Sequence, residues 1–101
     1  MSPSRQRNIP LETAEMLAVQ ALAFIAQDGE RLGRFLAVTG LGPAQIRDAV
    51  KEPGFLAGVL DHLAADEALL VAFAEHVAID PATVAAAREV LAGGAWKREV
   101  P

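Results

Sequence analysis

The chain has 101 residues, of which 52% are hydrophobic and 22% are charged, and its formal net charge is −4. This length fits one domain with a single core, and the composition excludes an intrinsically disordered chain. Cysteine is absent, which excludes disulfides and thiolate chemistry and fits a reducing compartment.

The first predicted helix follows Pro10 and runs to the break at Asp28-Gly29. Alanine, the best helix former, occupies 21 positions of the chain, and apolar residues recur here every three or four positions. Asn8 is expected to cap this helix, with Pro10 in its opening turn. Its polar side is limited to Glu12, Glu15 and Gln20. We therefore expect a helix that is central to the core or faces a partner.

Two shorter helices are predicted next. Asp28 is a natural cap for a helix from about Glu30 to Thr39, and Gly40 ends it where a left-handed residue costs least. Pro43 then starts a third helix, which runs through Val50. Its inward residues are the apolar Ile46, Ala49 and Val50, and the charged residues Arg47, Asp48 and Lys51 face outward.

The second half of the chain repeats these signals. Pro53 opens a fourth helix, which covers Phe55 to about Ala64. Asp66 caps a fifth, whose run Ala68–Ala74 is apolar on every side. We expect this run to be buried.

The sixth predicted helix begins at Asp80-Pro81 and ends at Gly93-Gly94. No strand pattern competes, so the predicted fold is all-α, a compact bundle of five to six short helices. We expect residues 1–9 to form a flexible arm, residues 10–94 a single helical domain and residues 95–101 a flexible tail. No apolar stretch approaches the roughly 20 residues of a membrane span, which favours a soluble, cytoplasmic protein without membrane contact.

The charges are unevenly distributed. Between residues 10 and 94 the sequence has 12 acidic and 5 basic side chains, and so acidic a body would repel nucleic acid over most of its surface. Four of these five basic residues lie in one stretch of the sequence: Arg31, Arg34, Arg47 and Lys51.

Reactive groups are few. Serine occurs only at positions 2 and 4, so an activated-serine triad has no place to form. A metal site would need convergence of His62, Asp66, Glu67, Glu75 and His76 across two helices, and their spacing matches no known ligand pattern. Solvated histidines are the simpler interpretation. We expect no catalytic residues, no metal and no cofactor.

The turn between the second and third predicted helices resembles a helix-hairpin-helix motif over residues 36–50. Gly40, Leu41 and Gly42 match its glycine–apolar–glycine pattern. The resemblance implies backbone N–H groups that approach a phosphate, flanked by the four clustered basic residues. Where the motif has a basic residue or threonine, this chain has Pro43-Ala44-Gln45. A plain turn between two helices is the competing interpretation.

Four longer segments are similar to a family of small helical proteins, domain of unknown function number 3572, found mainly in alphaproteobacteria. They are residues 17–26, 30–36, 55–61 and 66–70. The resemblance spans residues 11 to 92. It implies a bacterial, cytoplasmic, free-standing protein and implies no activity.

These observations favour a non-enzymatic protein-interaction module, able to bind a protein partner or to self-associate, because the first helix is almost uncharged and groups for chemistry are few. The alternative is weak, sequence-independent nucleic-acid binding through Gly40–Gly42 and the four basic residues. An enzyme would need a cluster of titratable groups that the sequence does not display.

Overall fold

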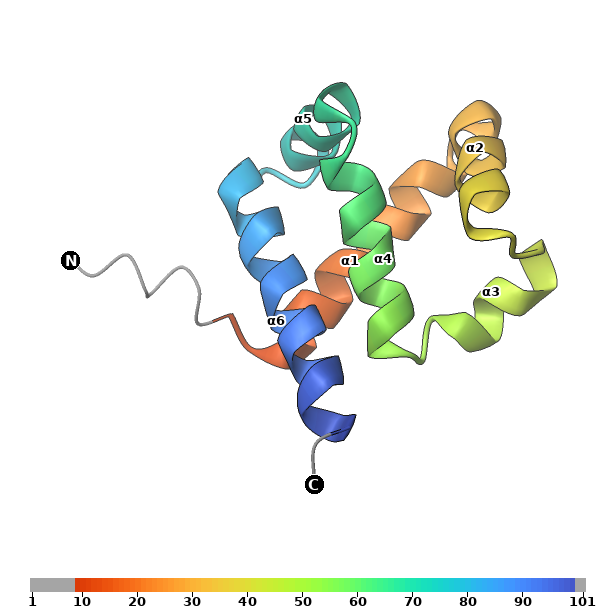
Figure 1. Cartoon of the computed structure of the whole chain (residues 1–101). Helices are drawn as coiled ribbons and strands as arrows, with labels where there is room; N and C mark the ends of the chain where they lie inside the picture. Colours follow the sequence, from red (N-terminus) through yellow and green to blue (C-terminus); the bar gives the residue numbers. More distant parts are fainter. Residues whose placement is uncertain (1–8, 100–101) are drawn as a thin grey trace.

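The computed structural model describes residues 9–99, and for residue 53 and residues 94–99 it describes the backbone alone. This part of the chain folds into helices and contains no strand, which confirms the predicted all-α class. The six helices are shown in Figure 1: α1 (Leu11–Ala26), α2 (Gly29–Thr39), α3 (Pro43–Ala49), α4 (Pro53–Ala64), α5 (Glu67–His76) and α6 (Pro81–Glu99).

Three helices, α1, α4 and α6, pack against one another and form the centre of the bundle. α5 packs on α4 and α6, α2 packs on α1, and α3 lies at the margin between the end of α2 and the start of α4 (Figure 1). The described chain extends 41 × 36 Å but is only 18 Å thick, which is room for two layers of helices with axes about 8–10 Å apart. A molecule of two layers covers one face of each helix and leaves the other open.

The core is entirely hydrophobic in the described residues, since no polar or charged residue is buried there. Each large side chain that is fully removed from water contributes roughly 1.5–3 kcal/mol of transfer free energy. The largest fully buried side chains of the core are Phe35, Phe73, Ile25, Leu60, Leu63, Leu91, Val59 and Val84. None of them comes from α3, which has no buried residue.

Aspartates cap three of the helices, as the sequence predicts. The Asp28 carboxylate accepts from two backbone N–H groups at the start of α2, the nearer at 2.9 Å. Asp66 accepts from one at 3.2 Å at the start of α5, and Asp80 from one at 2.9 Å at the start of α6. Each bond satisfies a donor that the first turn of a helix otherwise leaves without a partner.

The start of α1 differs from the prediction. Pro10 is its N-cap, and no side chain caps the helix. The carbonyl of Pro10 accepts the first helical bond, from the N–H of Ala14 at 3.0 Å. Asn8, the residue expected to cap this helix, lies outside the described residues.

Backbone conformation, more than residue type, determines where these helices end. Gly40 ends α2 with the predicted left-handed φ of 74°, whereas α5 ends in the same conformation at an alanine, Ala78, with φ of 59°. The predicted end of the sixth helix at Gly93-Gly94 is wrong, because α6 continues to Glu99. A glycine costs a helix about 1 kcal/mol but ends it only where it leaves the helical conformation, and Gly93 has no positive φ.

The apolar run of α5 is only partly buried, contrary to expectation. Leu69, Phe73 and Ala74 are buried, but Ala68 is exposed and Val71 is 40% exposed. α5 packs mainly on α4 and α6 and contacts α1 through Phe24, and none of these helices covers Val71 on its outer face. No single helix among residues 9–99 is long and apolar enough to cross a membrane; α5 and residues 81–93 meet that test only together, as a pair bent by 101°.

Candidate functional site

In the first half of the glycine turn between α2 and α3, the backbone N–H groups already donate to acceptors of the same chain. The N–H of Gly40 donates to the carbonyl of Leu36 at 2.8 Å. The Thr39 hydroxyl donates to the carbonyl of Phe35 at 3.0 Å and accepts from the N–H of Leu41 at 3.3 Å. Thr39 thus closes the end of α2, as expected for a threonine at a helix end.

The second half of the turn is also closed. The N–H of Gly42 donates to the side-chain Oε1 of Gln45 at 2.7 Å, which is one half of a capping box. Pro43 has no N–H to offer. A helix-hairpin-helix turn presents its N–H groups to a phosphate, but here the N–H groups of residues 40–42 are bonded inside the protein.

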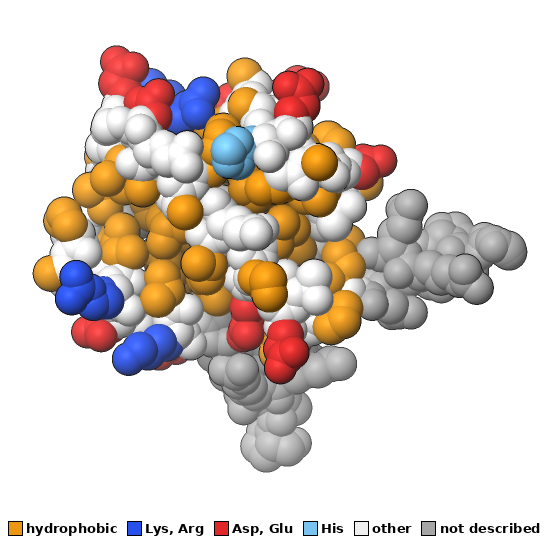
Figure 2. Space-filling view, turned by 180° about the vertical axis from the view of Figure 1, so that it is seen from behind, with side chains coloured by type: hydrophobic (Ala, Val, Ile, Leu, Met, Phe, Trp, Pro, Cys, Tyr) orange, Lys and Arg blue, Asp and Glu red, His pale blue; other side chains and the backbone are white. Residues whose placement is uncertain are grey.

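The four clustered basic residues do not share one surface. Arg31 and Arg34 line a groove between α2 and the α4–α5 pair. Arg47 and Lys51 are exposed on and just after α3 and do not line this groove. Figure 2 shows basic side chains at two separate margins of one face. The chain turns at Gly40–Gly42 between these two pairs, so residues that are close in sequence are divided between two margins.

A second groove, which we call the apolar groove, lies between α1, α2 and α3 and has a volume of about 320 Å³. None of its lining residues carries a polar side chain. They are Val19, Leu22, Ala23 and Ala26 of α1, Leu32 and Leu36 of α2, and Pro43 and Ile46 of α3.

Hydrophobic side chains project from α1 at the edge of the apolar groove. Met16 is 61% exposed and Val19 is 45% exposed, and Ala23 and Ala26 continue the exposed face of the helix. Figure 2 shows this face of the molecule, across which hydrophobic side chains form a broad patch with charges only at its margins. Patches of this kind on small proteins mark interaction surfaces.

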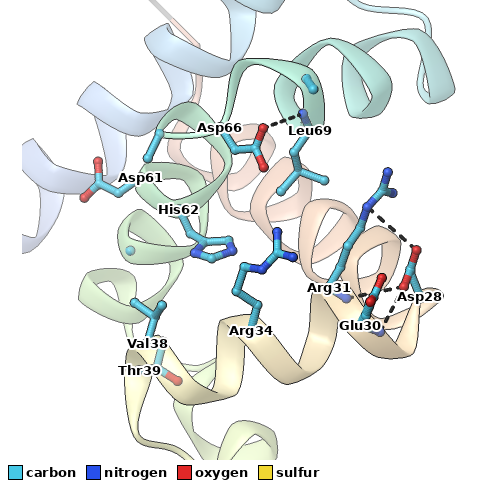
Figure 3. A pocket seen from close by; sticks show the side chains of 13 residues that line it. Asp28, Glu30, Arg31, Arg34, Val38, Thr39, Asp61, His62, Asp66 and Leu69 are labelled. Carbon is cyan, nitrogen blue, oxygen red and sulfur yellow. Dashed lines mark hydrogen bonds and ion pairs between the residues drawn. The ribbon is translucent and has the colours of Figure 1, made fainter.

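The groove that contains Arg31 and Arg34, which we call the mixed groove, has a volume of about 730 Å³. α2 forms one wall, and α4 and the start of α5 form the other. Figure 3 shows the Arg34 side chain directed into the groove next to the ring of His62. Arg31 lies further along the same wall, with its guanidinium over the ring of Phe24 at 5.4 Å from the centroid.

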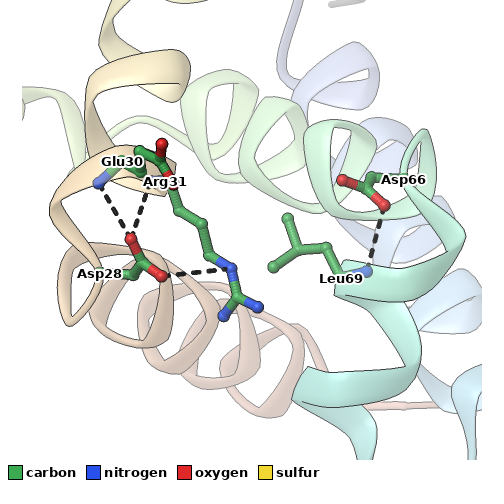
Figure 4. A network of polar contacts seen from close by, with 5 residues as sticks. All are labelled: Asp28, Glu30, Arg31, Asp66 and Leu69. Atoms are coloured by element: carbon green, nitrogen blue, oxygen red, sulfur yellow. Dashed lines mark hydrogen bonds and ion pairs between the residues drawn. The ribbon is translucent and has the colours of Figure 1, made fainter.

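Carboxylates also line the mixed groove, but most of them already have partners. Asp28 and Asp66 bond backbone N–H groups as helix caps (Figure 4), and Asp28 lies 3.9 Å from Arg31. Asp61 pairs with Arg88 of α6 at 3.2 Å. The Asp61–Arg88 pair joins α4 to α6, whereas the contacts of Asp28 and Asp66 are local to the starts of α2 and α5.

The two histidines lie apart. The half-buried ring of His62 packs edge-on against Phe35, with centroids 5.1 Å apart. His76 is exposed and stacks near Phe24 on α1 at 5.0 Å. Within the described residues no three His, Asp or Glu side chains are placed to hold one metal ion.

Neither groove was predicted from the sequence, although the residue pattern of α2 indicates two different surfaces. Leu32 and Leu36 are four residues apart and face the apolar groove. Arg31 and Arg34 occupy the neighbouring side and face the mixed groove. Phe35, fully buried, lies between these two sides. The helical period therefore predicts two distinct surfaces on α2, but not which helices complete them.

Comparison with known proteins gives one finding. A family model with the description "Protein of unknown function (DUF3572)" matches residues 11–94. No curated protein and no solved structure matches the chain. The matched segment begins at the first residue of α1 and includes every residue that lines either groove.

Proposed function

The chain belongs to the DUF3572 family, and we propose that it is a non-enzymatic protein-interaction module that pairs with a second copy of itself. The observation that carries this proposal is the apolar groove beside the projecting Met16 and Val19. We assign no catalytic role to any side chain. A cytoplasmic location, which the cysteine-free sequence fits, is part of the proposal.

The exposed face of α1 has the chemistry of an interface. From Met16 to Ala26 the helix carries no charged side chain. Water-exposed Met and Val gain roughly 25 cal/mol for each Å² of apolar surface that a partner covers. The outer face of α5 makes a useful contrast, because Val71 there lies between Glu67 and Glu75 in one shallow depression. The charges on α5 oppose a contact that excludes water, whereas α1 has no charged side chain from Met16 to Ala26.

The face of α1 is also complementary to itself. Large side chains, Met16 and Val19, stand toward one end, and small ones, Ala23 and Ala26, stand toward the other. A two-fold axis level with Ala21 pairs two α1 helices antiparallel, with Val19 opposite Ala23 and Met16 opposite Ala26. Each copy then inserts its large residues where the other is small, as an isologous contact requires.

The walls of the apolar groove extend this contact. Leu36 of α2 and Ile46 of α3 flank the small residues of α1, so they surround the position that the partner's Val19 would occupy. Ridges on one helix that fit the groove of another are the usual basis of helix packing. The pairing therefore uses all three helices that line the groove.

The first experiment measures association. Sedimentation equilibrium from about 10 µM to about 1 mM is expected to show a monomer–dimer equilibrium, which Val19→Lys shifts to monomer. Val71→Lys is the matched control, because Val71 has similar exposure but lies on α5. A wild type that stays monomeric at the highest concentration contradicts the proposal, as does equal loss of dimer in both variants.

The second experiment tests the orientation of the two copies. The absence of native cysteine makes single-cysteine variants unambiguous. We expect a mixture of Val19→Cys and Ala23→Cys chains, one of them tagged, to cross-link into the mixed dimer faster than either variant cross-links with itself. Preferred Val19→Cys self-linking would instead indicate a parallel pair.

A further inference from the structure

The mixed groove is a second surface, separate from the proposed dimer contact. It opens on the other side of α2 from the apolar groove, so pairing through α1 leaves it free. Its volume of about 730 Å³ is within the range of about 300–1,000 Å³ of small-molecule sites. The groove is therefore large enough for a small organic ligand.

Arg34 is the basic side chain of this groove that makes no ion pair with a described residue. Asp28 and Asp66 are used as helix caps, and Asp61 is paired with Arg88. Figure 3 shows the Arg34 side chain directed into the groove. A guanidinium offers two parallel N–H donors that match the two oxygens of a carboxylate.

His62 supplies a further donor at the same place. Its ring lies beside the Arg34 side chain in Figure 3. The ring packs edge-on against the fully buried Phe35, with 5.1 Å between the two centroids, and this contact restricts its motion. A preorganised imidazole loses little freedom when it donates to a ligand. Arg34 and His62 thus converge on one position in the groove.

The remaining lining determines what the rest of the ligand must be. Five lining residues have no polar side-chain atom: Val38, Gly58, Ala65, Ala68 and Leu69. The four carboxylates around the groove repel a second negative charge on a ligand. We propose that the mixed groove binds a small aliphatic monocarboxylic acid, whose carboxylate is held by Arg34 and His62 and whose chain lies against Val38 and Leu69.

The test uses the full chain, isotope-labelled, and hexanoate as the probe. NMR titration is expected to give saturable shifts of the Arg34 Nε–H and of the His62 ring. Arg34→Gln removes the bidentate partner and is expected to weaken binding at least about tenfold. Arg47→Gln makes the same change of charge on α3, outside the groove, and is expected to leave the affinity unchanged. Equal weakening by the two variants overturns the proposal.

A second variant separates the groove from general charge effects. Gly58 lies in the wall of the groove, and an added Cβ there would meet nothing within 4 Å. Gly58→Leu therefore starts a side chain in open space and projects it into the groove, and it raises helix propensity. We expect a folded protein that no longer binds hexanoate. Unchanged binding in this variant places the ligand elsewhere and overturns the proposal.

Two further probes test the ligand class. Inorganic phosphate and hexylammonium are each expected to bind more weakly than hexanoate. Phosphate carries more negative charge into a groove with four carboxylates, and hexylammonium faces Arg34. If hexylammonium binds as tightly as hexanoate, the groove selects cations through its aspartates and the proposal is wrong. The absence of any saturable shift with hexanoate has the same consequence.

Discussion

The centre of the bundle and the α2–α3 segment, residues 29–49, are held together in different ways. In α4 alone, Val59, Leu60 and Leu63 are completely buried. The α2–α3 segment has a single buried residue, Phe35, and α3 has none. Yet both candidate binding grooves are lined by α2. Regions with few buried contacts open most easily, so each candidate groove has one wall in the part of the fold with the fewest buried residues.

The largest difference is expected between core and α3 truncations. Leu60→Ala leaves a cavity inside a fully buried site and should lower the free energy of unfolding by about 3–5 kcal/mol. Ile46→Ala on α3 removes a side chain that is only partly buried and should cost about 1 kcal/mol. Urea denaturation followed by circular dichroism measures both. Similar losses for the two variants would show that α3 belongs to the core.

The attachment of α2 is expected to depend on Phe35. Its ring contacts Phe55 at 6.0 Å and His62 at 5.1 Å between centroids, both from α4. Phe35→Leu keeps a hydrophobic residue but loses these aromatic contacts, and should cost about 1–2 kcal/mol.

Hydrogen exchange locates the effect of this substitution. We expect faster exchange in α2 and α3, while the amides around Leu60 in α4 keep their protection relative to the new global stability. Uniform acceleration through α1, α4 and α6 would contradict the separation of the two regions. The substitution should also weaken hexanoate binding, because Phe35 orients His62 in the mixed groove.

A smaller effect is expected from the cap that begins the α2–α3 segment. Asp28→Ala removes bonds to two backbone N–H groups and should lower the free energy of unfolding by about 1 kcal/mol. Asp28→Asn retains an acceptor and should change it by less than about half of that. If the two variants lose stability equally, the contact between Asp28 and Arg31 at 3.9 Å contributes more than the cap.

Local signals made much of this fold predictable. Asp28, Asp66 and Asp80 act on N–H groups two or three residues away, so the sequence contains both partners of each bond. Gly40 likewise predicts the end of α2 from the sequence alone. The prediction that all of residues 68–74 are buried is wrong for a non-local reason. Whether Val71 is exposed depends on whether another helix covers that face of α5.

The candidate site was less predictable than the fold. The four basic residues were grouped because they are close in the sequence. Whether Arg34 and Arg47 lie on the same surface depends on the direction of α3 after the turn, which the sequence does not give. Neither groove can be derived from the period of one helix, since each needs three helices in place. The pairing of Asp61 with Arg88, 27 positions later in the numbering, is equally invisible to local reasoning.

The smallest predicted effects come from reciprocal substitutions at two left-handed residues that follow helices, Gly40 after α2 in the α2–α3 segment and Ala78 after α5 outside it. Ala78 ends α5 with φ of 59°, with the N–H of Ile79 donating to the carbonyl of Ala74 at 2.9 Å. Glycine reaches this conformation without the steric cost that alanine pays, so Ala78→Gly should raise the free energy of unfolding by about 0.5–1 kcal/mol.

Gly40→Ala is the reciprocal change at the end of α2, and it should cost about 1 kcal/mol. An added Cβ at Gly40 meets no atom of the rest of the protein within 4 Å, so this cost comes from the local left-handed backbone and not from tertiary contacts. Thermal unfolding of both variants and of the double variant measures the two effects, which should add because the ends are far apart in the fold. A loss of stability in Ala78→Gly would mean that the alanine methyl contributes more through contacts than its backbone conformation costs.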